Sequence, residues 1–71
     1  FNKDIENIQL LNRLSESVHP AVIESTIHGL GHIADDFPKQ CHPILERIIF
    51  KPNLPIELQD YAKRAIDGYI Q

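Results

Sequence analysis

Proline opens two amphipathic segments that lie 35 residues apart in this chain. Pro20 and Pro55 each begin a run in which apolar residues recur every three or four positions, which places side chains on one face of an α-helix. Proline is favoured in the first turn of a helix, where its missing N–H would have no intrahelical partner. The shift aligns the apolar positions in pairs: Ile23 with Leu58, Ile27 with Ala62, Leu30 with Ala65 and Ala34 with Tyr69. This pattern predicts two equivalent helices of an internal repeat.

A further apolar segment at helical spacing precedes each of these two helices. The predicted helices cover residues 3–16, 20–36, 43–50 and 55–69. No segment shows the alternation of β-branched residues that is typical of a strand. We therefore expect an all-α fold in which the four helices form two stacked antiparallel hairpins, within a single domain that spans residues 1–71.

Several of these segments resemble a known repeat family. Residues 29–35, Gly-Leu-Gly-His-Ile-Ala-Asp, resemble the Ala-Leu-Gly-x-Ile-Gly-Asp ending of the second helix in HEAT-like repeats of the phycobilisome-lyase type. Residues 44–49 look like the short first helix of the next repeat, and residues 62–70 resemble the ending of its second helix. The resemblance implies a HEAT-like α-α superhelix, an α-solenoid whose second helices line a concave face. It implies no reaction, and the segment before residue 20 matches no repeat signature.

A chain of 71 residues buries only about 60% of its unfolded surface, and solenoids typically need about three repeats for stability. The apolar stripe of the first predicted helix is wide, and Gly31 lies at the edge of the stripe of the second, where the lack of a side chain would let a neighbouring helix approach. We expect the first helix, or the open side of the last, to pack against something further. Because the chain starts at Phe1 rather than Met, this could be upstream sequence, further repeats or a second copy.

Composition excludes several classes of function. The chain has 7 Lys and Arg against 10 Asp and Glu, a net charge of −3, and no basic cluster, so no nucleic-acid partner is expected. No apolar run approaches the roughly 18 residues that would cross a bilayer, so no membrane partner is expected. Cys41 is the single cysteine and cannot form an internal disulfide. We predict that Cys41 is a small buried residue and that the protein is cytoplasmic.

Glu24, His28 and His32 recur every four residues, which places them on one ridge of a helix, with Asp35 three residues further on. Two histidines at this spacing can chelate one metal, with Glu24 as a third ligand. A metal-dependent enzyme fragment is therefore one alternative, although Gly29 stands where a zinc protease of the His-Glu-x-x-His type has its catalytic glutamate. A solvated polar face is the other interpretation.

The 35-residue shift carries this ridge onto a second one in the last helix, and adjacent ridges on a solenoid face commonly bind proteins. The predicted partner-binding residues are Glu24, His28, His32, Asp35, Gln59, Lys63 and Asp67. We accordingly expect a protein-interaction module with a protein partner of undefined identity, no catalytic residues and no cofactor. A structural scaffold that associates with itself as a homo-oligomer is a further alternative.

Two smaller features have simpler interpretations. His19 and His42 each precede a proline and are predicted at helix N-caps, where histidine is a poor capping residue. Tyr61 and Tyr69 are expected to pack within or between helices, since aromatic side chains at helical spacing usually belong to the core.

Overall fold

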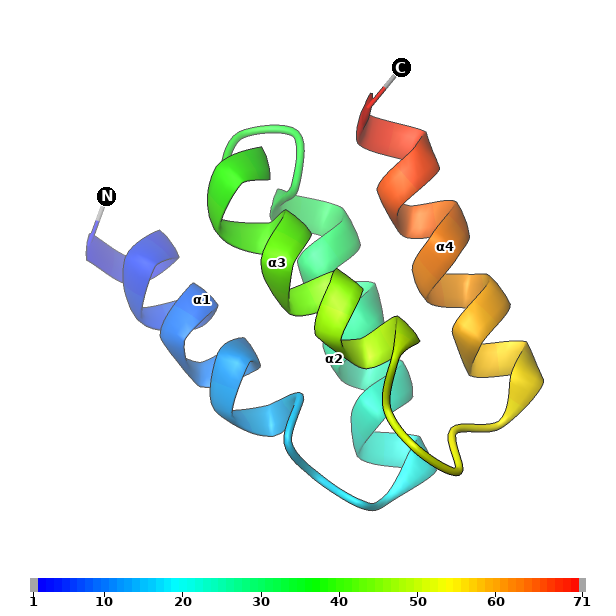
Figure 1. Cartoon of the computed structure of the whole chain (residues 1–71). Helices are drawn as coiled ribbons and strands as arrows, with labels where there is room; N and C mark the ends of the chain where they lie inside the picture. The colour runs from blue at the N-terminus through cyan, green and yellow to red at the C-terminus, as the bar shows by residue number, and fades with distance from the viewer. Residues whose placement is uncertain (1, 71) are drawn as a thin grey trace.

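The computed structural model describes residues 2–70, and its side chains are described for residues 3–68. Within this range the chain forms four α-helices joined by short loops (Figure 1). The helices are α1 (Asn2–Leu14), α2 (Pro20–Ile33), α3 (Pro38–Ile49) and α4 (Ile56–Ile70). No strand occurs within this range, which confirms the all-α prediction. Consecutive helices run antiparallel, so the α1–α2 and α3–α4 connections share one end of the molecule (Figure 1).

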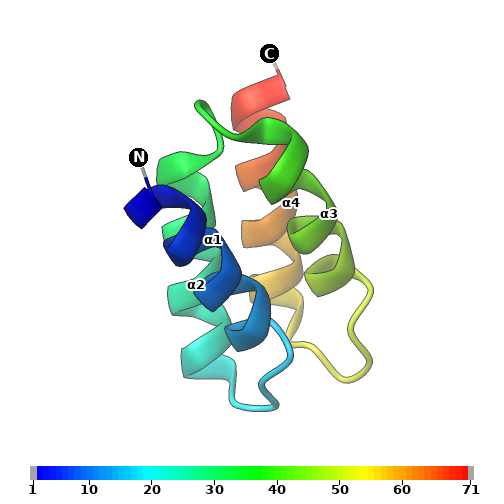
Figure 2. The ribbon, with the colours of Figure 1, turned by 90° about the vertical axis from the view of Figure 1, so that its left-hand side faces the viewer.

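The central pair of the fold is α2 and α3, with α1 on one side and α4 on the other (Figure 1). In Figure 2, α1 lies in front of this pair and α4 behind it. Helix α2 contacts each of the other three helices, whereas α1 and α4 do not touch within the described part of the chain. Helices α2 and α4 run in the same direction and pack against each other. The face formed by these two helices is therefore continuous from one helix to the next.

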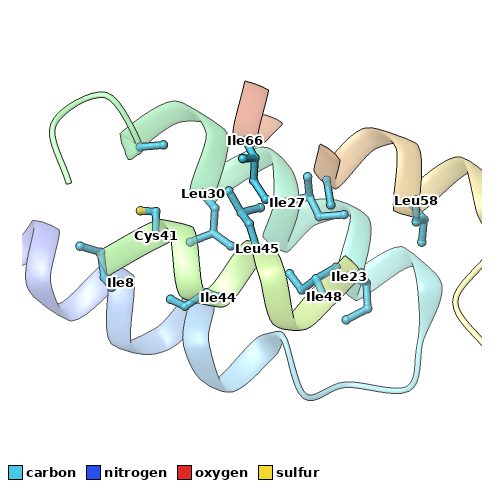
Figure 3. Packing of buried hydrophobic residues seen from close by; sticks show 12 residues of the cluster. Ile8, Ile23, Ile27, Leu30, Cys41, Ile44, Leu45, Ile48, Leu58 and Ile66 are labelled. Atoms are coloured by element: carbon cyan, nitrogen blue, oxygen red, sulfur yellow. The ribbon is translucent and has the colours of Figure 1, made fainter. Parts of the chain in front are cut away.

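Apolar side chains from all four helices form a single core. Ile27 and Leu30 of α2 meet Leu45 of α3 at its centre, and all three are fully buried (Figure 3). Of the positions predicted from the repeat, those on α2 are buried, as are Leu58 and Ala62 on α4, whereas Ala65 is half-buried. Tyr69 lies outside the residues whose side chains are described. The buried cluster consists of Ile8, Ile23, Ile27, Leu30, Ala34, Cys41, Ile44, Leu45, Ile48, Leu58, Ala62 and Ile66.

Helix α3 begins at Pro38 rather than at Pro43, so the predicted start was wrong by five residues. Pro38 occupies the first turn, where proline is well tolerated, and Pro43 lies inside the helix, where it removes one backbone hydrogen bond. The extra turn buries Cys41 completely, which confirms its predicted burial. Cys41 continues the apolar stripe of Ile44, Leu45 and Ile48 at spacings of three and four residues, and its burial favours the longer helix.

The earlier start of α3 also changes the place of His42, which lies within the helix rather than at its N-cap. Its Nε2 atom lies 2.7 Å from Oε1 of Glu46, one turn further on. His19, in contrast, is the N-cap of α2 as predicted, and its side chain makes no capping hydrogen bond. Its carbonyl oxygen accepts the backbone N–H groups of Val22 and Ile23.

Helix α2 begins at Pro20 as predicted, and the remaining helix ends differ from the prediction by one to three residues. Helix α1 ends at Leu14 instead of residue 16, and α2 ends at Ile33 instead of residue 36. Helix α4 begins at Ile56, immediately after Pro55, whose carbonyl oxygen accepts two N–H groups of the first turn. Pro20 is helical and Pro55 is not, so the two helices that the 35-residue shift aligns start one position out of register.

A polar cluster attaches the end of α1 to α3. Arg47 Nη2 donates to Ser15 Oγ at 2.8 Å and to the side-chain and backbone oxygens of Asn12. Ser15 is buried, and its hydroxyl donates to the Asn12 carbonyl at 2.5 Å. These bonds satisfy groups that would be costly to bury unpaired.

The close helix approach expected at Gly31 occurs at Gly29 instead. A Cβ atom built on Gly29 would lie 3.0 Å from Leu11 Cδ2 of α1, whereas one on Gly31 would meet no atom within 4 Å. The expectation for Gly31 was therefore wrong. Gly29 faces α1, and Gly31 faces the groove that is described below.

Helix α1 buries only part of its wide apolar stripe. Ile8 is buried and Leu11 is half-buried, but Ile5 and Leu10 are 43% and 45% exposed. Within residues 3–68, the other exposed large apolar side chains are Val18, Phe50 and Ile56.

Candidate binding groove between α2 and α4

The polar ridge of α2 lies on the surface, as predicted. Glu24, His28 and His32 are all exposed, and they face away from the stripe that fills the core. Because residues four apart lie on successive turns of one helix face, the burial of Ile23, Ile27 and Leu30 leaves this ridge to solvent.

The two histidines contact each other. Nε2 of His32 lies 3.0 Å from Nε2 of His28, and the rings meet edge to face, with centroids 4.5 Å apart and planes at 86°. On its other side, Nδ1 of His28 lies 3.1 Å from the hydroxyl of Tyr61 on α4. Each neutral imidazole has one donor and one acceptor nitrogen. His28 is therefore the central member of a hydrogen-bonded chain that runs from His32 to Tyr61.

An open groove follows the boundary between α2 and α4, with a volume of about 470 Å³. The apolar part of its lining comes from Ile27 and Ala65, and Gly31 adds no side chain. The remaining lining residues are His28, His32, Tyr61 and Arg64. An adjoining depression shares His28 and Tyr61 with this groove and is also lined by Glu24 and Ser25. We call the two together the α2–α4 groove.

Charge is unevenly distributed along this groove. Its main part is lined by Arg64 and the two histidines without a described carboxylate, whereas the adjoining depression includes Glu24. Nε of Arg64 donates to the Asp60 carbonyl at 3.4 Å. Among the lining residues of the main part of the groove, Arg64 is thus the one with a formal charge, in a chain with a net charge of −3.

The α4 residues that line the groove differ from those that the repeat predicted. Lys63 and Asp67 are exposed but do not line it, and Gln59 is half-buried, with its Nε2 donating to the Ile49 carbonyl at 3.1 Å. Tyr61 and Arg64 line it instead. The pair could have been found from the spacing of Tyr61, Arg64 and Ala65, which share one side of a helix.

Asp35 is exposed and lies in the turn after α2. It is therefore not on the helical ridge that its spacing from His32 predicted. Backbone N–H groups of residues 36 and 37 bond to the Ile33 carbonyl and close this turn.

The three-ligand metal site is not assembled. Within the described residues, no group of three or more His, Cys, Asp or Glu side chains is placed to hold a metal ion, so Glu24 does not join the histidine pair.

None of the helices in the described range has the length and apolar character that crossing a membrane requires.

No protein-family model, curated protein or solved structure was found to match this chain. A functional conclusion therefore depends on the geometry of the α2–α4 groove and on the resemblance in residues 29–35 and 44–49.

Proposed function

We propose that this chain is a HEAT-like α-solenoid segment that acts as a protein-interaction module through the face formed by α2 and α4. Helix α1 packs on α2, α3 packs on α4, and the two second helices contact each other, as in two stacked hairpins. The stripes aligned by the 35-residue shift both turn toward the core. Repeats of this kind stack side by side and use one extended face for binding.

The observation that carries the proposal is the α2–α4 groove itself. Tyr61 and Arg64 belong to the residue types that are enriched in protein interfaces, and together with the two histidines they line the groove beside an apolar floor of Ile27 and Ala65. We propose that the partner places an extended segment along this floor, with a carboxylate near Arg64. The outer parts of the partner would contact Glu24, which lines the adjoining depression, and the exposed α4 residues Lys63 and Asp67.

The half-exposed stripe of α1 supports the solenoid assignment. Ile5 and Leu10 remain partly exposed, so they contribute only part of the stability that full burial would give. The corresponding helices of a solenoid bury such positions against the preceding repeat. A cytoplasmic location is part of the same proposal, because the single thiol, Cys41, is buried and needs no partner.

Selection of peptides from a random displayed library against the chain tests this proposal. Selected peptides should carry acidic residues, and their binding should fall at least about tenfold, or 1.4 kcal/mol, on Arg64→Glu. Lys39→Glu is the matched control, because it makes the same charge change on an exposed residue of α3 outside the groove. Equal losses in both variants would mean that only net charge matters, and this would refute the groove as the binding site.

The flanking residues are tested by Glu24→Lys and Asp67→Lys. Both should weaken those selected peptides that place a basic residue against these carboxylates, while the melting temperature stays unchanged, since the two positions are exposed. A fall in the melting temperature would assign them a structural role instead. Sedimentation of the isolated chain distinguishes the self-associating scaffold, which predicts a dimer that persists after Arg64→Glu.

A further inference from the structure

We propose that His28 and His32 form a two-imidazole site for a divalent transition-metal ion, with a preference for Cu²⁺ or Ni²⁺ over Zn²⁺. The proposal is independent of partner binding and needs no third protein ligand. It rests on the position of the two Nε2 atoms, on the contact of His28 with Tyr61, and on the opening of the pair into the groove.

The separation of the two nitrogens matches the bite of a chelate. Imidazole nitrogens bind such ions at about 2.0–2.1 Å, so two donors 3.0 Å apart subtend about 91–97° at the metal. Both rings lie on one face of α2 on successive turns, so rotation of each ring would direct its Nε2 atom toward a shared ion.

This angle favours some ions over others. It is near the angle of about 90° between neighbouring ligands in square-planar Cu²⁺ and Ni²⁺ complexes, and below the tetrahedral angle of about 109° that Zn²⁺ adopts. The general order of affinities also places Cu²⁺ above both Ni²⁺ and Zn²⁺. We therefore expect affinity to fall from Cu²⁺ to Ni²⁺ to Zn²⁺.

The Tyr61 hydroxyl is placed to accept a hydrogen bond from the His28 tautomer that the metal requires. A histidine that binds metal through Nε2 carries its proton on Nδ1 and usually donates it to an oxygen atom. In His28 this donor would be Nδ1–H and the acceptor the Tyr61 hydroxyl, whose oxygen lies 3.1 Å away. In the absence of metal, one N–H lies between the two Nε2 atoms. That proton moves to Nδ1 of its own ring through solvent, so two neutral imidazoles bind the ion without a net release of protons.

The groove leaves the other coordination positions open. Both histidines are exposed and line the open side of the groove, so water or a group from a bound molecule can complete the shell. Arg64 lines the same groove, and its charge opposes a bound cation. Arg64→Gln should consequently raise the metal affinity, a direction opposite to its expected effect on an acidic peptide.

Calorimetric titration of the chain with CuCl₂, NiCl₂ and ZnCl₂ at neutral pH tests the site. Wild type should bind one equivalent of Cu²⁺, and His28→Gln and His32→Gln should each lower the affinity at least about tenfold. The matched control is His19→Gln combined with His42→Gln, which also removes histidines but keeps the pair intact. It includes His42 because that residue forms its own pair with Glu46.

Retained affinity in His28→Gln or His32→Gln, or a loss in the His19/His42 control, would overturn the proposal. Electron paramagnetic resonance of the Cu²⁺ form gives a second readout, because two coordinated imidazoles produce nitrogen couplings that either single variant must reduce. Circular dichroism checks that both variants remain helical. Tyr61→Phe should lower the affinity about tenfold with the stoichiometry unchanged, and an unchanged affinity would exclude its orienting role.

Discussion

Replacing the two glycines of α2 separates helix propensity from packing. Alanine is favoured over glycine inside a helix by about 0.8–1.0 kcal/mol, and neither glycine has a positive φ that would oppose the change. At Gly31 a new Cβ would touch nothing within 4 Å, so Gly31→Ala should stabilise the fold by nearly this full amount. In a domain of this size, that corresponds to a rise in melting temperature of about 4–8 °C.

Gly29→Ala starts with the same gain but meets α1. The new methyl carbon would lie 3.0 Å from Cδ2 and 3.4 Å from Cδ1 of Leu11, so the Leu11 side chain must shift. A side chain forced away from its preferred rotamer costs about 0.5–1.5 kcal/mol, which cancels most of the gain. We expect Gly29→Ala to change the free energy of unfolding by about zero and to stay below Gly31→Ala.

Urea unfolding followed by circular dichroism measures both variants, and Leu11→Ala supplies the control. Shortening Leu11 removes the contact, so Gly29→Ala made in that background should recover the gain seen at Gly31. The reasoning would be refuted if Gly29→Ala stabilised the wild-type chain as much as Gly31→Ala, or if the Leu11→Ala background made no difference.

Three further predictions address the core, the polar cluster and the buried thiol. Leu45→Ala should lower the free energy of unfolding by about 2.7–5.0 kcal/mol, because Leu45 is fully buried. A total of about 4–10 kcal/mol is typical for a chain of this length, so the urea midpoint should fall strongly. Arg47→Ala should remove about 1 kcal/mol and lower hydrogen-exchange protection in α1 more than in α4; equal losses would argue against its role in holding α1. Burial raises the pKa of the Cys41 thiol above its ordinary 9.0. As pH rises, the thiol therefore ionises in the unfolded chain before it does in the folded one, and the free energy of unfolding should fall above about pH 9. Cys41→Ala should lack this part of the pH dependence. If wild type and Cys41→Ala showed the same pH dependence of urea unfolding from about pH 7 to about pH 10, the role of the buried thiol would be contradicted.

The sequence was sufficient to predict the helices and the buried stripes of α2 and α4, because both depend on local periodicity. It misplaced the start of α3 because Pro43 was interpreted as a helix start. Proline is compatible with the first turn but does not require it, and tertiary packing places Pro43 inside the helix. Counting Cys41 as apolar, together with Ile44, Leu45 and Ile48, would have extended the stripe and the helix toward residue 38.

The groove was only half predictable, for a geometric reason. Helices α2 and α4 run in the same direction and both turn their apolar stripes toward the core, so the rows of side chains that the 35-residue shift aligns point in similar directions. The row that contains His28 therefore cannot face its own equivalent, Lys63, and faces the opposite side of the neighbouring helix instead. That side contains Tyr61 and Arg64. Identifying it requires the packing angle and rotation of α4, which depend on how the core side chains fit together.

Gly31 links the stability of the fold to the proposed site. Gly29 has a packing reason to be glycine, because α1 approaches it closely, but nothing packs against Gly31 within 4 Å. A small domain thus carries an unfavourable helix residue, at about 1 kcal/mol, without a structural gain. Natural proteins tend to break such local rules at functional positions. Gly31 lies between His28 and His32 on the α2 side of the groove, where a methyl group would begin to fill the space that a ligand needs. The stabilising Gly31→Ala variant should therefore bind selected peptides more weakly than wild type, and unchanged binding would remove this argument for the groove.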